Sequence, residues 1–206
     1  MVDPCTQNLA AYIEVAAAFE SGDRSQMQAG ALVLAGAESA ECVHEVLRFL
    51  HLFYGFPRLV RAWNALPESL RAGPHASEPT SESPSPSTLV PTSAPCSASG
   101  LAAFENLYQD RATRVLEHLQ QLDGLSTHWI LEHAYAQVMS RPHLATPVQE
   151  RLAALALAST HCWQQWRSHV DIALGLGISV ETLRQDLLVT DWPNAATRAH
   201  ALELLA

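Results

Sequence analysis

The stretch RPHLATPVQERLAALALASTHCWQQWRSHVDIALGLGISVETLRQDLL, residues 141–188, indicates the fold, because its pattern is typical of three consecutive helices. Val148, Leu152 and Leu155 recur at intervals of three and four residues, which places their side chains on one face of a helix. An amphipathic helix needs a partner to cover its apolar face. We therefore expect these helices to pack together in a helical domain.

The expected helix ends carry recognisable signals. Thr146-Pro147-Val148-Gln149 is typical of a capping box with proline at the first helical position. A second helix is predicted from about His161 to Leu176, with Gly177 closing it, and Ser179 is expected to begin a third.

The N-terminal part of the chain has the same helical periodicity. It contains the segments LAAYIEVAAAFE (9–20), QAGALVLAG (28–36) and ECVHEVLRFLHLF (41–53). Because the chain has few β-branched runs and no Asn-Gly hairpin signals, the predicted fold class is all-α. The order of helix, glycine, acidic helix start and proline turn in residues 31–66 is similar to that in 171–202, which favours a tandem duplication. Two ordinary helical hairpins would give the same pattern.

Residues 73–100 interrupt this pattern with eight Ser, six Pro and three Thr. Such a composition buries too little apolar surface to offset the entropy of ordering, so we expect a disordered linker. The predicted organisation is a helical half over 1–72, the linker over 73–100 and a second helical half over 101–206. Cys96 lies in the linker and is not expected to do chemistry.

Charge and composition exclude several classes of function. The net charge is −9 with only 12 Lys and Arg, which argues against a nucleic-acid partner. No run of 18 apolar residues and no signal-peptide pattern is present, so we expect no membrane span and a cytoplasmic location. The cysteines at 5, 42, 96 and 162 form no CxxC pair, and neither a metal site, a disulfide frame nor a cofactor is expected.

One helical stripe carries candidate chemistry. Cys162, Gln165, Trp166 and His169 are spaced so that they share a face of the predicted helix, and this face is more polar than packing alone requires. Glu150 lies on the preceding helix, where a carboxylate would orient the imidazole of a histidine. On periodicity alone, a packing role for the stripe is favoured over a site.

The same stretch resembles the carboxymuconolactone decarboxylase family, which includes the AhpD-like alkylhydroperoxidases. Residues 141–188 are similar to its Arg-Pro-x-Leu lead, its helix with a Glu, its helix with a His and its Gly-x-Ser/Thr-x-Glu helix start. FYGFPRLVRAWNAL (53–66) is similar to its Tyr-x-Gly-Phe/Trp-Pro segment. The resemblance implies a tandem of the AhpD-like helical fold and a homo-oligomer, a trimer or a hexamer.

The resemblance also implies roles for individual residues. In the AhpD-like pattern Glu-x11-Cys-x2-Cys-x3-His, Glu150, Cys162 and His169 match the Glu, the first Cys and the His, whereas Gln165 replaces the second Cys. The decarboxylase branch lacks both cysteines and keeps the His. In the first half an offset of 141 residues places Ser21 and Gln28 opposite Cys162 and His169, so that half is expected to be structural.

Three functions therefore remain open, in order of preference. The first is a decarboxylase-like enzyme for a small organic molecule, in which His169 acts as general acid/base, Glu150 orients it, and Gln165, Trp166, Tyr54 and Phe56 line the pocket. The second is a thiol peroxidase that uses Cys162 with an external resolving thiol. The third is a helical oligomer without catalysis.

Overall fold

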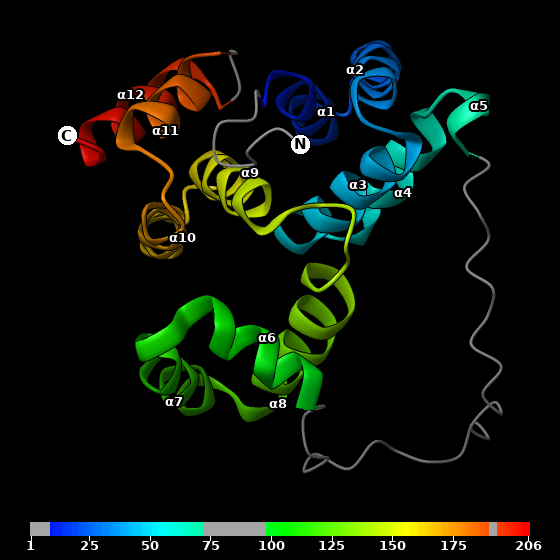
Figure 1. Cartoon of the computed structure of the whole chain (residues 1–206). Helices are drawn as coiled ribbons and strands as arrows, with labels where there is room; N and C mark the ends of the chain where they lie inside the picture. Colours follow the sequence, from blue (N-terminus) through cyan, green and yellow to red (C-terminus); the bar gives the residue numbers. More distant parts are fainter. Residues whose placement is uncertain (1–8, 72–97, 190–192) are drawn as a thin grey trace, which may run out of the picture. The chain divides into compact units, whose positions relative to one another are not determined.

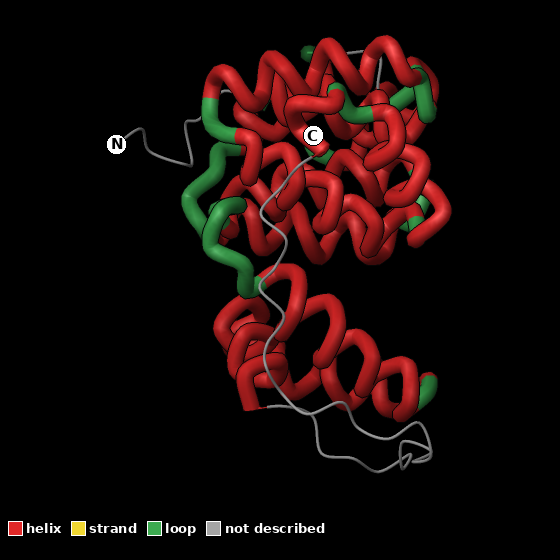
Figure 2. Tube along the Cα trace, turned by 90° about the vertical axis from the view of Figure 1, so that its right-hand side faces the viewer, coloured by secondary structure: helices red, strands yellow, loops and turns green. Residues whose placement is uncertain are grey.

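The computed structural model describes residues 9–71, 98–189 and 193–206. Within these ranges the chain is built from helices joined by short turns and contains no strand (Figure 2). The predicted all-α class is thus confirmed for the described residues. None of the helices described is long and apolar enough to cross a membrane.

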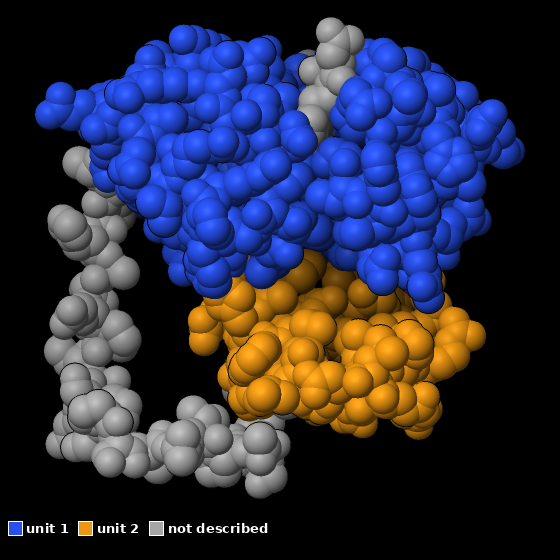
Figure 3. Space-filling model, turned by 180° about the vertical axis from the view of Figure 1, so that it is seen from behind, with its two compact units in different colours: residues 1–71, 141–206 blue, residues 72–140 orange. Residues whose placement is uncertain are grey.

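The chain forms two compact units, residues 1–71 with 141–206, and residues 72–140 (Figure 3). This grouping differs from the division expected from the sequence, in which 101–206 formed one half. The reason is tertiary: the helices after residue 145 pack on those before residue 55, whereas the helices of residues 98–139 pack on one another.

The first unit contains nine helices in the described residues (Figure 1). Their bounds are α1 Ala10–Ser21, α2 Arg24–Ala37, α3 Ala40–Tyr54, α4 Phe56–Ala65, α5 Glu68–Arg71, α9 Thr146–Ser159, α10 Trp163–Gly175, α11 Val180–Leu188 and α12 Ala195–Leu204.

Helix α9 forms the centre of this unit. Every residue from Val148 to Ala158 is buried, and α9 contacts α10, α11 and α12 as well as α1 and α3 (Figure 1). A helix that is apolar on all sides is stable only when neighbours surround it. Its N-terminal turns carry three buried polar residues, Gln149, Glu150 and Arg151, each of which needs a partner.

The predicted capping box at the start of α9 is wrong. Ala145 precedes the helix and makes no side-chain cap, although Pro147 does lie in the first turn as expected. Because Gln149 is buried, its side chain turns back and donates from Nε2 to the carbonyl oxygen of Leu144 at 2.9 Å. The prediction for Ser179 is confirmed, since its hydroxyl accepts from the amide of Thr182.

The order of helices in the first unit fits the similarity between residues 31–66 and 171–202. Helices α2, α3 and α4 follow one another as α10, α11 and α12 do. Both α3 and α11 begin after a serine whose hydroxyl accepts an amide three residues ahead, Ser39 from Cys42 and Ser179 from Thr182. A tandem duplication and an AhpD-like fold remain predictions.

The second unit consists of α6 Ala98–Tyr108, a 3-10 turn Gln109–Arg111, α7 Ala112–Leu122, α8 Gly124–Trp129 and the π-helix η2 Ile130–Met139. Helix α6 packs closely on η2 at Gly100, where a Cβ atom would come within 2.3 Å of the carbonyl oxygen of Leu131. Since α6 begins at Ala98, residues 98–100 are helical and the predicted linker ends earlier than expected. Residues 73–97, with Cys96, lie outside the described residues.

Candidate functional site

Glu150 and His169 meet between two adjacent helices of the first unit. Oε2 of Glu150 on α9 lies 2.8 Å from Nδ1 of His169 on α10. The two helices pack side by side and are joined by a short turn, so a residue in the first half of α9 lies beside one in the middle of α10. The proximity expected from the sequence is therefore present.

The burial of this pair is unequal. The side chain of Glu150 is 0% exposed and that of His169 is 12% exposed. Oε1 of Glu150 is buried without a hydrogen-bond partner among the described residues, whereas buried polar atoms are nearly always paired. A carboxylate in this position is costly for the fold, because half of its hydrogen-bonding capacity is unused.

The contact also determines how the imidazole can react. An ionised carboxylate only accepts hydrogen bonds, so Nδ1 of His169 donates to Glu150. Nε2 is then the nitrogen that can take up or release a proton, and no hydrogen bond joins it to any described residue. A buried carboxylate that holds the tautomer and orientation of a histidine is the arrangement used in general acid/base catalysis.

The aromatic ring closest to this pair is one that the sequence analysis did not select. Phe53 on α3 lies with its ring centroid 6.3 Å from that of His169, in an edge-to-face arrangement. Phe53 is adjacent to Tyr54 in the sequence, but only the packing of α3 on α9 reveals which of the two rings faces the histidine.

Two of the three aromatic residues that were expected to line the pocket, Tyr54 and Phe56, lie elsewhere. The hydroxyl of Tyr54 is 2.6 Å from Oγ of Ser159, at the opposite end of α9 from Glu150. Ser159 donates to the carbonyl oxygen of Ala156, so Tyr54 is the donor in this pair. Phe56 is 58% exposed and its ring lies on His51, without a ring contact to His169.

The expected stripe on α10 is divided by the structure. Helix α10 begins at Trp163, so Cys162 precedes the helix instead of lying in its first turn. The reason is the turn before it: His161 adopts a left-handed φ of 58° and its Nε2 pairs with Oγ1 of Thr197 at 2.9 Å. Cys162 is exposed, and the hydrogen bond that its thiol makes to the described residues is a long one, 3.7 Å, to the carbonyl oxygen of Thr160.

The other two members of the stripe also separate. Gln165 is exposed, whereas Trp166 is 1% exposed. Trp166 lines a small cavity with Arg151 and Asp186, whose side chains form a buried pair with Nε–Oδ2 and Nη2–Oδ1 distances of 2.7 Å. Burial raises the pKa of Asp186 above its usual value, and the hydrogen bond and charge of Arg151 only partly oppose this shift. This buried pair, which the sequence did not reveal, ties α9 to α11.

Among the described residues there is no group of three His, Cys, Asp or Glu side chains that could hold a metal ion. Comparisons with protein-family models, with curated proteins and with solved structures find no match to this chain.

Proposed function

We propose that this chain is an enzyme that acts on a small organic molecule by general acid/base chemistry at His169, in the manner of a carboxymuconolactone decarboxylase. The observation that carries the proposal is the 2.8 Å contact between Nδ1 of His169 and the fully buried carboxylate of Glu150. No cofactor or metal is part of the proposal.

The reaction class follows from what Nε2 can do. Loss of CO2 from a lactone acid leaves an enolate, whose carbon must receive a proton. Protonated His169 would donate this proton from Nε2, and Glu150 would stabilise the positive charge on the ring. Phe53, whose ring lies in an edge-to-face arrangement with that of His169, would contact the apolar part of the substrate.

The test is a screen of carboxylated lactones for CO2 release with the wild-type chain and three variants. His169→Gln is expected to abolish turnover and Glu150→Gln to lower kcat by about 10²-fold or more, whereas Cys162→Ser should retain it. Turnover that survives in His169→Gln would refute the proposal.

A second candidate is the thiol peroxidase. Its support is the exposure of Cys162 at the start of α10, where the backbone amides of a helix favour an anion. Peroxide would oxidise the thiolate to a sulfenic acid, and an external thiol would then condense with it to a mixed disulfide, releasing water. The absence of a cysteine at position 165 and the separation of seven residues between Cys162 and His169 place this candidate second.

The two candidates give opposite results in one measurement. Intact-mass spectrometry after brief peroxide and dimedone treatment would show an adduct in the wild type that is lost in Cys162→Ser if the thiol is the reactive group. Absence of an adduct would remove the peroxidase. If neither CO2 release nor the adduct is found, the remaining hypothesis is a helical homo-oligomer without catalysis, which the oligomeric state in solution would address.

A further inference from the structure

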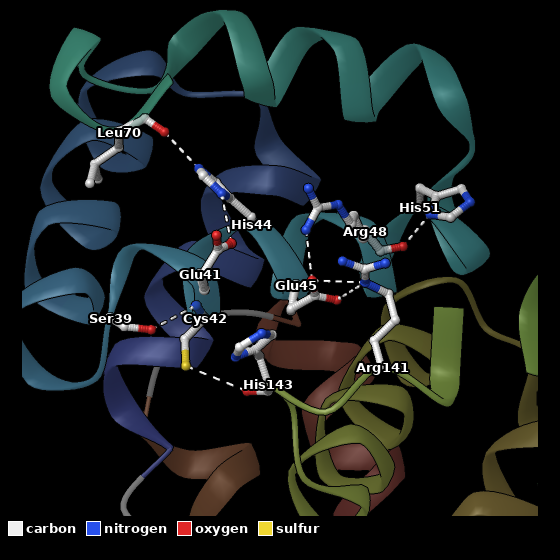
Figure 4. Close-up of polar contacts among 10 residues, drawn as sticks. All are labelled: Ser39, Glu41, Cys42, His44, Glu45, Arg48, His51, Leu70, Arg141 and His143. Atoms are coloured by element: carbon white, nitrogen blue, oxygen red, sulfur yellow. Dashed lines mark hydrogen bonds and ion pairs between the residues drawn. The ribbon is translucent and has the colours of Figure 1, made fainter. Parts of the chain in front are cut away.

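A second cluster of charged side chains surrounds Glu45, in the middle of α3 (Figure 4). The side chain of Glu45 is 2% exposed, and its carboxylate accepts hydrogen bonds from two guanidinium groups. Nη1 of Arg48 lies 2.7 Å from Oε1, and Nε of Arg141 lies 2.8 Å from Oε1 and 2.7 Å from Oε2. Arg48 is one helical turn from Glu45, whereas Arg141 comes from the segment that leads to α9.

This cluster carries a surplus positive charge. Two guanidinium groups share one carboxylate, and neither has a second acidic partner among the described residues. The side chains of Arg48 and Arg141 are 31% and 42% exposed, so both reach solvent. Both terminal nitrogens of Arg141, together with Nε and Nη2 of Arg48, have no protein acceptor within the described part of the chain.

The surroundings of the two arginines on the α4 side are aromatic and apolar. The guanidinium of Arg48 lies 5.7 Å from the ring centroid of Trp63, and the ring of His51 lies 4.8 Å from that of Phe56. Phe56, Val60 and Trp63 recur at helical spacing on α4, so Val60 belongs to the same stripe. Phe56 and Val60 are 58% and 59% exposed.

We propose that Arg48 and Arg141, held in place by the buried carboxylate of Glu45, bind the carboxylate of a small organic acid whose apolar body lies along Phe56 and Val60. A guanidinium presents its donors in a planar fork that matches the two oxygens of a carboxylate. One ligand carboxylate neutralises the surplus charge of the cluster. The proposal does not depend on the chemistry proposed for His169.

The alternative is that Arg48 and Arg141 serve only to hold the segment at residue 141 on α3, and this alternative does not account for both arginines. Fastening residue 141 to α3 requires only one guanidinium on Glu45, and the Nε–H of Arg141 already reaches both oxygens of this carboxylate. The second guanidinium adds like-charge repulsion, and its contact with the Trp63 ring leaves its Nε and Nη2 without a protein acceptor in the described part of the chain.

The test is isothermal titration calorimetry, in which sodium benzoate is titrated into the full chain at constant ionic strength. We expect one saturable site with a Kd on the order of 1 mM, weaker binding of acetate, and no binding of uncharged benzyl alcohol. Arg48→Lys and Arg141→Lys keep the charge but lose the fork, and each should weaken benzoate binding about tenfold or more. The matched control is Arg184→Lys on α11, since Arg184 is 37% exposed and pairs with Glu181 outside the cluster.

A second measurement requires no variant. Phenylglyoxal modifies exposed guanidinium groups, and peptide mass spectrometry would report protection of Arg48 and Arg141, but not of Arg184, by benzoate. The proposal is overturned if benzoate neither binds nor protects, or if the lysine variants bind as the wild type does. Tighter binding of inorganic phosphate through the same two arginines would overturn the assignment to a carboxylate.

Discussion

Replacing Glu150 by glutamine should make the protein more stable, by about 1–3 kcal/mol in the free energy of opening of α9. A substitution that stabilises the fold is expected at a residue whose side chain serves the activity of the protein at a cost in stability. The same substitution is predicted above to lower activity.

The magnitude follows from the two oxygens of the carboxylate. At Oε2, the change replaces a carboxylate acceptor by a neutral amide acceptor for the Nδ1–H of His169, a loss of about 1 kcal/mol. At Oε1, the wild type buries part of a negative charge without a partner, and the penalty for a buried ion is several kcal/mol even after relaxation. Glutamine has the same shape and no charge. Its NH2 group is left without an acceptor in place of Oε1, but burying a neutral donor costs less than burying a charge, so the gain exceeds the loss.

The assay is native-state hydrogen exchange followed by mass spectrometry, because it reports the opening of α9 without requiring that the two units unfold together. The matched control is Glu45→Gln. Glu45 is as deeply buried as Glu150, but both of its oxygens are paired with arginine, so this variant should be destabilised. If the free energy of opening of α9 in Glu150→Gln were lower than in the wild type by more than about 1 kcal/mol, the reasoning would be refuted.

Four further predictions concern other parts of the fold. Asp186→Asn should destabilise the first unit by about 3–5 kcal/mol in urea unfolding at neutral pH, because Arg151 is left buried without its partner, whereas Arg151→Met with Asp186→Leu should recover most of the loss. Since burial raises the folded pKa of Asp186 above its usual 3.8, protonation of this carboxyl adds stability that is fully present below that pH and disappears as the pH rises through the folded pKa, which leaves the ion pair with Arg151 at neutral pH. NMR titration of the carboxyl carbon should show the upward shift, and a downward shift would contradict it. Gly100→Ala should lower the free energy of opening of α6 and η2, measured by hydrogen exchange, by about 1–3 kcal/mol, because the added methyl group meets the backbone of Leu131. Unchanged exchange would contradict this packing. Tyr54→Phe should cost about 0.5–1.5 kcal/mol in the same urea assay through loss of the bond to Ser159, with Phe53→Leu as a comparison that leaves this bond intact.

Much of the candidate pair could be predicted from the sequence. Helical periodicity identifies the face of each helix that carries these residues, and a short turn between the helices brings the two faces together, which is the relation of Glu150 to His169. The same reasoning failed for Cys162, because a helix start depends on the backbone conformation of the preceding turn. Here the left-handed His161, paired with Thr197 of a distant helix, delays the start of α10.

Contacts between segments that are far apart in the chain could not be predicted from any local pattern in the sequence. Arg141 and Glu45 are 96 residues apart, and Arg151 and Asp186 are 35 apart, so neither pair shares a periodic pattern. The choice of Phe53 over Tyr54 as the ring beside His169 likewise depends on the angle at which α3 crosses α9.

The sequence by itself determined the helical class, the start of α11 after Ser179 and the approach of Glu150 to His169, because these depend on local interactions and on the packing of two consecutive helices. Only the tertiary structure decided which helices group into one unit, which buried carboxylate is fully paired and which keeps an unpartnered oxygen. Those outcomes depend on how side chains from distant segments fill the same space, and periodicity along a single helix carries no information about them.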